Sequence, residues 1–440
     1  MIIFINKIIY IKMKKSFRIF LILIVISEVF LIKLHHQSNS VLYANGNDEF
    51  VPEELFNKDN LVIDNGAKPL KQTITSKEVI SEMGLGWNLG NTLDAWNGLK
   101  QDIDSETCWG NPKTTKEMIE ELYRKGFRTI RLPTTWRNHL IDENYTIDPA
   151  WMKRVKEIVD WCIEAGLYVI LNVHHDNADL VEGSSIPYGN GYYPLLKDLE
   201  ESERFLFNVW KQITIAFNNG YDHHLIFEGL NEPRLKDHKN EWSFKKEDPT
   251  CEEACSVLNK YLELIVKTIR ESGGNNSRRF IMVTPLSAGF DSAIKSDFQF
   301  PNDRNYNSIN KLILSVHMYQ PYDFTMSKDL TLNVFKDEYK TSLDENFNKL
   351  YNKFIKEGYS IIVGEFGARD KNNLEERIKW GKYYIETVRK NEMSCVIWDN
   401  GIFKKEVDAV GSFYGLYHRE ELTWQTDELV DTYIKAAELN

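Results

Sequence analysis

The sequence predicts an α/β fold, a parallel (β/α)8 TIM barrel in a single domain. From Gly84 onward, eight short apolar runs rich in β-branched residues alternate with amphipathic helical runs. The strand runs are almost continuously apolar, as in strands that are buried on both faces of a parallel sheet. Several helical runs stop at a glycine, namely Gly126, Gly166 and Gly358, which is typical of a helix C-terminus that hands over to a strand. Eight such alternations favour a closed barrel over an open sheet.

Each predicted element follows from its own pattern. A strand is expected wherever four to seven apolar residues stand between polar clusters, and a helix wherever apolar residues recur every three or four positions. The predicted strands are residues 84–89, 128–133, 167–173, 225–230, 280–284, 312–317, 360–363 and 394–398. The clearest helical patterns are residues 115–125, 151–165, 202–217, 255–271, 374–391 and 427–439.

The N-terminal segment has to be set apart from the barrel. Residues 17–32 are apolar except for three positions, Lys12, Lys14 and Lys15 precede them, and Ala44 stands at a plausible cleavage point. This pattern predicts a signal peptide over 1–44 and a secreted, extracellular protein. A single membrane anchor is the alternative, because the apolar run approaches the ~20 residues that a span needs. We expect a polar leader over 45–75 and the barrel domain over 76–440, and translation could begin at Met13.

The net charge indicates which kinds of partner the chain can bind, and the cysteines indicate which cross-links or metal sites it can form. Residues 1–44 contain six basic residues and one acidic residue, so their removal changes the formal net charge from −11 to −16. Such an acidic chain repels nucleic acid and anionic membranes and suits a neutral substrate, and we expect a monomer without stable membrane association. Of five cysteines, Cys251 and Cys255 are close enough to bridge, whereas Cys162 and Cys395 fit packed thiols. No CxxC pair is present, which argues against a structural zinc site.

Polar residues gather at the ends of the predicted strands, where barrels of this type build their active sites. They are Asn88, Arg131, His174, His175, Asn231, Glu232, His317, Tyr319, Glu365 and Trp398. Glu232 and Glu365, 133 residues apart, each follow a buried run. Cleavage of an acetal needs one carboxylic acid to protonate the leaving oxygen and one carboxylate to attack or stabilise the sugar carbon, so this pair predicts a glycosidase.

Two of these residue groups have other interpretations. Neighbouring residues of a strand point to opposite faces, so His174 and His175 are poorly placed to bind one metal ion, and we expect no metal and no cofactor. Arg131 could be a purely structural ion-pair partner. Glu228, inside the same strand run as Glu232, is interpreted as structural and hydrogen-bonded below the site.

Eight motifs together resemble the retaining glycoside hydrolases of family 5, and most of all the endo-β-1,4-glucanases of subfamily 4. In order they are GWNLGNTLDA (86–95), WGNPKTT (109–115), RLPTTW (131–136), NVHHD (172–176), FEGLNEP (227–233), SVHMY (315–319), VGEFG (363–367) and WDNG (398–401). The resemblance implies that Glu232 is the acid/base and Glu365 the nucleophile. It also implies that Asn231 binds the sugar 2-hydroxyl and that Trp398 is the platform below the sugar that precedes the cleaved bond.

The remaining site residues follow from the same resemblance. His174, His175 and His317 would orient the glutamates and the substrate, and Arg131 with Tyr319 would stabilise the charge of the nucleophile. A drier setting would raise the pKa of Glu232. Further contacts with substrate are expected from Asn88 and from tryptophans in predicted loops, Trp96, Trp109, Trp136 and Trp242, with Trp109 the strongest.

The function predicted on this basis is a secreted, retaining endo-β-1,4-glucanase, a cellulase acting on β-glucan polysaccharide. Alternatives within the family are a xyloglucanase, a mixed-linkage glucanase, a xylanase or a mannanase. A catalytically silent glycan-binding barrel is the alternative from another class. Such a barrel would be expected to lack a glutamate or the neighbouring Asn231, and this chain retains all of them.

Overall fold

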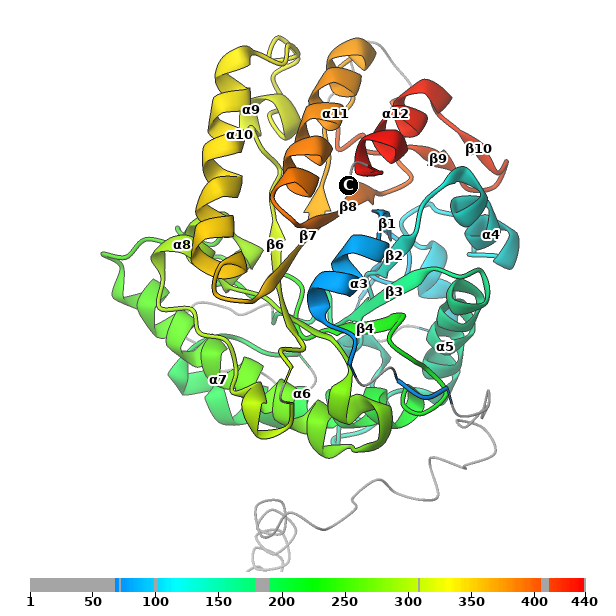
Figure 1. The fold of residues 1–440 in the computed structure, drawn as a ribbon. Coiled ribbons are helices and arrows are strands. Elements are labelled where there is room, and N and C mark those ends of the chain that lie inside the picture. Colours follow the sequence, from blue (N-terminus) through cyan, green and yellow to red (C-terminus); the bar gives the residue numbers. More distant parts are fainter. Residues whose placement is uncertain are drawn as a thin grey trace, which may run out of the picture. The chain divides into compact units, whose positions relative to one another are not determined.

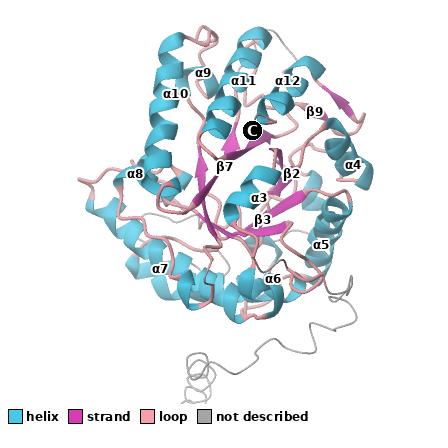
Figure 2. Ribbon diagram, viewed as in Figure 1, coloured by secondary structure: helices cyan, strands magenta, loops and turns pink. Residues whose placement is uncertain are grey.

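In the computed structural model, eight parallel strands form a closed barrel inside a layer of helices (Figures 1 and 2). The strands are β1 (Leu85–Leu89), β2 (Thr129–Leu132), β3 (Tyr168–Asn172), β4 (Leu225–Glu228), β5 (Ile281–Val283), β6 (Leu312–His317), β7 (Ser360–Phe366) and β8 (Ser394–Asp399). Each strand pairs with its neighbour in chain order, and β8 pairs with β1 to close the ring. The predicted fold class is confirmed.

The structure describes residues 68–70, 73–98, 102–178, 190–307, 309–404 and 411–438. The expected signal peptide over 1–44, the alternative membrane anchor and most of the expected leader lie outside these residues. Among the residues described, no helix combines the length and the apolar character that a membrane crossing requires.

The helices alternate with the strands along the chain. They are α3 (Ser76–Glu82), α4 (Lys116–Lys125), α5 (Pro149–Glu164), α6 (Leu199–Ala216), α7 (Pro249–Glu271), α8 (Phe290–Lys295), α9 (Tyr322–Thr325), α10 (Asp337–Leu350), α11 (Leu374–Lys390) and α12 (Asp427–Ala437). Short 3₁₀ turns are η1 (Ile103–Thr107), η2 (Arg137–His139), η3 (Leu196–Asp198), η4 (Gly274–Arg278), η5 (Leu286–Ala288) and η6 (Asp303–Asn305), and η7 (Tyr351–Ile355) is a π-helical turn. A two-stranded ribbon, β9 (Tyr417–His418) with β10 (Thr423–Trp424), precedes α12.

Helix α4 shows how the sequence sets these boundaries. The hydroxyl of Thr115 accepts a hydrogen bond from the backbone N–H of Met118 and so caps the first turn. Ile119 and Leu122 lie on the buried face together with Met118, and burial of each such side chain contributes roughly 1.5–3 kcal/mol. The helix ends at Gly126, whose φ of 122° is open to glycine and strained for other residues.

One end of the barrel is closed by the segment that precedes β1. In Figure 1, α3 lies across the end of the barrel that faces the viewer. Its Val79 and Ile80 pack with Ile74 and Met83 into an apolar cluster with strand residues such as Ile170. This closed end lies at the N-terminal ends of the strands, because α3 leads directly into β1.

The packed domain begins somewhat before the predicted boundary at residue 76. Leu70 is buried, and the backbone N–H of Lys68 donates to the carbonyl oxygen of Asn219. Lys68 and Leu70, near the end of the leader predicted over 45–75, therefore pack on the barrel.

A register shift between β6 and β7 positions two side chains of the mouth. Val316 pairs with Val363, but the next residue, His317, pairs with Glu365. A Cβ atom on Gly364 would lie 3.0 Å from Nε2 of His317, so a side chain there would require His317 to shift by a few tenths of an ångström. Strand β7 also runs on to Phe366, beyond the predicted end at 363, so Glu365 lies within the strand.

All five cysteines are free thiols, so Cys251 and Cys255 do not form the bridge that their spacing allows. Cys162 and Cys395 are buried, as their patterns predicted. Burial raises the pKa of Cys255 to about 11 and that of Cys395 to about 12, which keeps both thiols protonated at neutral pH.

Candidate active site

A buried arginine organises the mouth of the barrel. Arg131 on β2 is fully buried and donates hydrogen bonds to Glu228 (2.7 Å), Asn88 (2.9 Å), Asn231 (2.6 Å) and Glu365 (2.9 Å). Burial opposes its charge, but the two carboxylates outweigh burial and raise the pKa of Arg131. The guanidinium is therefore a permanent cation between two carboxylates.

Glu228 on β4 binds the guanidinium of Arg131 from below the site. Besides the Arg131 contact, its carboxylate accepts hydrogen bonds from the amide of Asn172 (2.9 Å) and the hydroxyl of Ser315 (2.6 Å). Because Glu228 is fully buried and both oxygens are engaged, its position agrees with the structural interpretation. Asn172 and Ser315 were missed by the sequence reasoning; the available signal was a polar residue inside an otherwise apolar strand run.

Glu365 and Glu232 lie close together above this layer. Glu365 accepts from Arg131 on one oxygen and from the Tyr319 hydroxyl on the other (2.9 Å). Nδ1 of His317 lies 2.8 Å from Oε1 of Glu232 and 3.6 Å from Oε1 of Glu365. One carboxylate oxygen of each glutamate and one nitrogen of His317 all lie within 4.8 Å of one another. Two carboxylates this close can act on the same bond.

The protonation order of this group differs from the sequence prediction. Burial, together with the charge of Glu232, raises the pKa of Glu365. Burial also acts to raise the pKa of Glu232, but the contact with His317 outweighs it and lowers that pKa. Burial acts to lower the pKa of His317, and the two carboxylates overcome it and raise the pKa. The predicted rise for Glu232 is thus wrong in the unliganded protein, because His317 lies nearer to Glu232 than to Glu365.

Two residues expected to touch substrate are not accessible. Asn88 is fully buried, and its amide donates to the backbone carbonyl of Gly364 (3.0 Å). Trp136 is also fully buried, with its indole N–H on the carbonyl of Asn172 (2.9 Å). Its ring turns inward because the backbone N–H groups at the start of η2 bind the carboxylate of Asp176. Both predictions of substrate contact are corrected to structural roles.

The rings of Trp398 and His174 stack at the mouth. Their rings are parallel within 4°, with centroids 6.2 Å apart. Trp398 is half-buried, and Gly90 allows its close approach, since a Cβ atom there would lie 2.8 Å from the indole ring. Burial lowers the pKa of His174 well below its usual value, so its imidazole is neutral. A neutral ring beside an indole suits contact with an uncharged ligand.

Trp109 lies on the rim near the second histidine. Its side chain is 36% exposed, its indole N–H donates to the carbonyl of Trp96, and its ring centroid lies 5.8 Å from that of His175. Nε2 of His175 lies 3.6 Å from a carboxylate oxygen of Asp94, a buried residue that the sequence reasoning did not single out. Trp109 is therefore placed where a ligand at the mouth could reach its ring.

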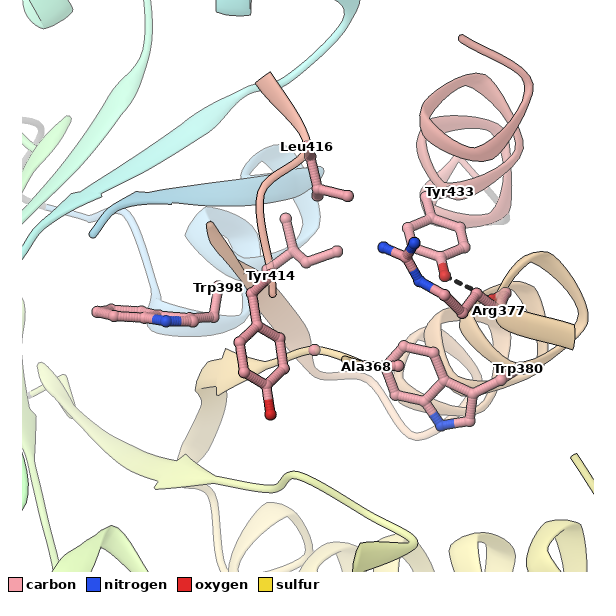
Figure 3. Close-up of a pocket in the computed structure, with 9 residues that line it drawn as sticks. Ala368, Arg377, Trp380, Trp398, Tyr414, Leu416 and Tyr433 are labelled. Atoms are coloured by element: carbon pink, nitrogen blue, oxygen red, sulfur yellow. Dashed lines mark hydrogen bonds between the residues drawn. The ribbon is translucent and has the colours of Figure 1, made fainter. Parts of the chain in front are cut away.

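A small cavity lies behind Trp398, between the ends of β7 and β8 and helices α11 and α12 (Figure 3). Its lining includes Trp398, Tyr414, Trp380, Arg377 and Tyr433. The cavity volume of about 10 Å³ is close to that of one water molecule, so it is far too small for a sugar.

Two side-chain groups at the mouth have the spacing of metal ligands. They are Asp94 with His174 and His175, and Glu232 with His317 and Glu365. In the second group the atoms already contact one another or Arg131, whose charge repels a cation. The expectation of a metal-free site stays a prediction.

Comparison with known proteins agrees with this geometry. Residues 94–404 match the sequence profile of the family described as cellulase, glycosyl hydrolase family 5. The chain is 39% identical to endoglucanase B of Neocallimastix patriciarum over 84% of this chain and 73% of that protein.

Solved structures of the same family are similar in fold. A mutant lichenase from Caldicellulosiruptor sp. F32 in complex with cellotetraose is 35% identical with a TM-score of 0.76, and the match covers 84% of this chain and 97% of that one. A broad-specificity endoglucanase from Ruminococcus champanellensis with bound cellotriose is 35% identical with a TM-score of 0.74, covering 83% and 100%. The chain therefore belongs to the cellulase family, glycosyl hydrolase family 5, and is a glycoside hydrolase of the endoglucanase class.

Proposed function

We propose that the protein hydrolyses internal β-1,4-glucosidic bonds with retention, using Glu365 as nucleophile and Glu232 as acid/base. The observation that carries the proposal is the different setting of two nearby carboxylates. Glu365 accepts hydrogen bonds from Arg131 and Tyr319 on separate oxygens, which stabilise its ionised form against the effect of burial, whereas Glu232 contacts a histidine that can exchange a proton with it. Retaining enzymes have carboxyl groups about 5–5.5 Å apart and inverting enzymes about 6.5–9.5 Å apart, and a closest approach within 4.8 Å favours retention.

The reaction then follows in two steps. Glu365 attacks the anomeric carbon while Glu232 gives its proton to the glycosidic oxygen, so that the leaving sugar departs as an alcohol and a glycosyl ester forms on Glu365. In the second step Glu232 takes a proton from water as the water oxygen displaces the ester, and Glu365 is regenerated. The proton that Glu232 needs at the start can come from His317 across the 2.8 Å contact.

The substrate we propose is β-1,4-glucan, with mixed-linkage glucan and xyloglucan as further polymers. Support comes from the relatives named above, a lichenase with cellotetraose and a broad-specificity endoglucanase with cellotriose. Initial rates on carboxymethylcellulose, lichenan, xyloglucan, xylan and mannan rank these possibilities. A silent glycan-binding barrel would leave every one of them intact.

We also propose that the mature protein is a secreted monomer. The support is the sequence pattern of residues 1–44 and the acidic charge of the rest. Expression of the full chain in a secreting bacterial host, followed by N-terminal sequencing of the protein in the medium, tests the cleavage near Ala44. Retention of the uncleaved chain in the membrane fraction would favour the anchor instead.

Chemical rescue tests the two roles. In Glu232→Ala, azide should restore turnover of an activated aryl β-cellobioside and yield the β-glycosyl azide, because azide attacks an intact glycosyl-enzyme. In Glu365→Ala, azide should yield the α-glycosyl azide, because it replaces the nucleophile itself. Absence of rescue in both variants, or the opposite pair of products, would contradict the assignment.

A further inference from the structure

One buried tyrosine that takes no part in the proposed mechanism lies beside a residue that does. Tyr414, on the segment between β8 and β9, is 6% exposed. Its ring meets the ring of Tyr319 edge to face, with centroids 5.9 Å apart and 68° between the ring planes. It also lines the small cavity behind Trp398 (Figure 3). Tyr414 therefore packs against the residue whose hydroxyl donates to Glu365.

A glycine lets the two tyrosine rings approach the end of β7. Gly367 follows Glu365 by two residues, and a Cβ atom on it would lie 3.2 Å from Cδ1 of Tyr414 and 3.6 Å from Cε1 of Tyr319. Both rings therefore fill the space next to this glycine. A smaller side chain at position 414 would leave a void there, into which the ring of Tyr319 can turn.

The hydroxyl of Tyr414 ties its own segment to the loop that carries Tyr319. It donates to the carbonyl oxygen of Thr325 on α9 (3.1 Å), and the hydroxyl of Thr325 donates to the carbonyl oxygen of Tyr319 (2.8 Å). The carbonyl oxygen of Thr325 also accepts from the backbone N–H of Arg369 (3.0 Å), which follows β7. The segments after β6, β7 and β8 thus meet at one oxygen atom.

We propose that Tyr414 is a positioning residue that keeps the Tyr319 hydroxyl on Glu365. The inference rests on the proposed function, in which Glu365 attacks the sugar. The Tyr319 hydroxyl lies 2.9 Å from Oε2 of Glu365, and it stays there only while the two side-chain torsions of Tyr319 are restricted. Packing against Tyr414 supplies that restriction, so the hydrogen bond is in place before substrate binds.

The charges around the two side chains indicate how a change at Tyr414 reaches the nucleophile. Besides burial, the groups that act on the pKa of Glu365 include His317, Glu232, Arg131 and Tyr319. Burial raises the pKa of Tyr414 despite the nearby charges of Arg369 and Arg377, so its hydroxyl is protonated at neutral pH. Replacing Tyr414 therefore removes no charge, and its effect passes to Glu365 through the Tyr319 hydroxyl.

The pH profile of kcat/KM on an activated aryl β-cellobioside tests the inference. Tyr414→Leu should move the acid limb to higher pH by about 0.5–1 pH unit, because a displaced Tyr319 hydroxyl no longer lowers the pKa of Glu365. Tyr414→Phe keeps the ring and loses only the bond to Thr325, so the limb should move in the same direction by less. In a Tyr319→Phe background, Tyr414→Leu should move the limb no further.

Tyr433 provides a matched control. It lines the same cavity from α12, and its hydroxyl donates to the carbonyl oxygen of Arg377 (2.5 Å). Tyr433→Leu should lower the melting temperature and leave the acid limb in place.

Two outcomes would overturn the inference. One is an acid limb that stays in place in every Tyr414 variant that folds, and Tyr414→Phe keeps this test available if Tyr414→Leu does not fold. The other is a shift by Tyr414→Leu that is equally large in the wild-type and Tyr319→Phe backgrounds. A wild-type enzyme that leaves the aryl cellobioside intact would overturn the proposed function instead.

Discussion

At the scale of single residues, the chemistry depends on how charge is shared at the mouth. Arg131 is a single buried cation that lies between Glu228 and Glu365. Its positive charge is therefore shared between the two carboxylates. If the negative charge of Glu228 is removed, the positive charge of Arg131 stabilises the Glu365 carboxylate more strongly. Glu228 therefore acts on the reaction through Arg131, as a positioning residue.

Glu228→Gln should displace the acid limb of the kcat/KM profile to lower pH. The substitution keeps the shape of the side chain, and the freed charge of Arg131 lowers the pKa of Glu365, which burial otherwise raises. Since Glu365 must be ionised to attack in the proposed mechanism, activity then persists into more acidic solution. Asp303→Asn is a suitable control, because Asp303 pairs with buried Arg270 (2.6 Å) away from the mouth. An acid limb that stays in place would contradict the shared-charge account.

Tyr319→Phe should move the same limb in the opposite direction. The Tyr319 hydroxyl donates to Glu365 and so lowers the pKa of that carboxyl. Loss of this hydroxyl raises the pKa of Glu365. As the pH falls, the variant therefore loses activity at a higher pH than the wild type does. A hydrogen bond to a charged group contributes about 1.5–3 kcal/mol, so kcat should also fall about tenfold to a hundredfold. Tyr261→Phe, which removes a buried hydrogen bond to the carbonyl of Tyr193, should leave the profile unchanged.

The sequence predicted most of the polar residues that meet at the mouth. Glu232, Glu365, Arg131, His317 and Tyr319 are in contact as a group because each stands at a strand end, and the barrel brings strand ends together. The errors in the site prediction concern the direction in which side chains point.

Asn88 and Trp136 are near the mouth but turned inward. Their orientation depends on distant carbonyl acceptors, Gly364 for Asn88 and Asn172 for Trp136, which no local pattern reveals. The protonation order was mispredicted for a similar reason, since it depends on the difference between two His317 contacts, 2.8 Å and 3.6 Å.

At the scale of elements, strands were easier to predict than helices. All eight strand predictions are confirmed, with shifts of a few residues at their ends. The helical run predicted to stop at Gly358 was given no start, because the sequence of α10 is mostly polar and only Leu343, Phe347 and Leu350 are buried. Helix α7 begins six residues before the predicted start at 255, at Pro249, which follows the capping Asp248.

Gly381 on α11 yields a prediction about helix packing. Glycine to alanine in a helix usually stabilises by up to about 1 kcal/mol. Here the added Cβ atom would overlap the ring of Tyr433 on α12, so Gly381→Ala should destabilise the protein instead, by about 1–3 kcal/mol. Urea unfolding measures the change. Combining it with Tyr433→Leu should recover part of the loss relative to Tyr433→Leu alone, and an increase in stability for Gly381→Ala would refute the close contact.

At the scale of the whole molecule, the apolar cluster and the polar site residues lie at opposite ends of the barrel. The N-terminal ends of the strands are closed by α3 and its apolar cluster, and the polar layer around Arg131 lies at the C-terminal ends. The resemblance in eight motifs predicted the family, because motif order along the chain reflects strand order around the ring. The proposed polymer preference concerns the rim loops and the proposed export concerns the N-terminal segment, and the barrel pattern carries no information about either.

The measurement that tests the central claim most directly is the identification of the residue that bonds to the sugar. Incubation with 2-deoxy-2-fluoro-β-cellobiosyl fluoride should trap the glycosyl-enzyme, because fluorine slows its hydrolysis more than the good leaving group slows its formation. Peptide mass spectrometry should then find one fluorocellobiosyl group on Glu365, within the β7 segment Ser360–Phe366. A label on Glu232, or turnover that inverts the anomeric centre and leaves no label, would contradict the account.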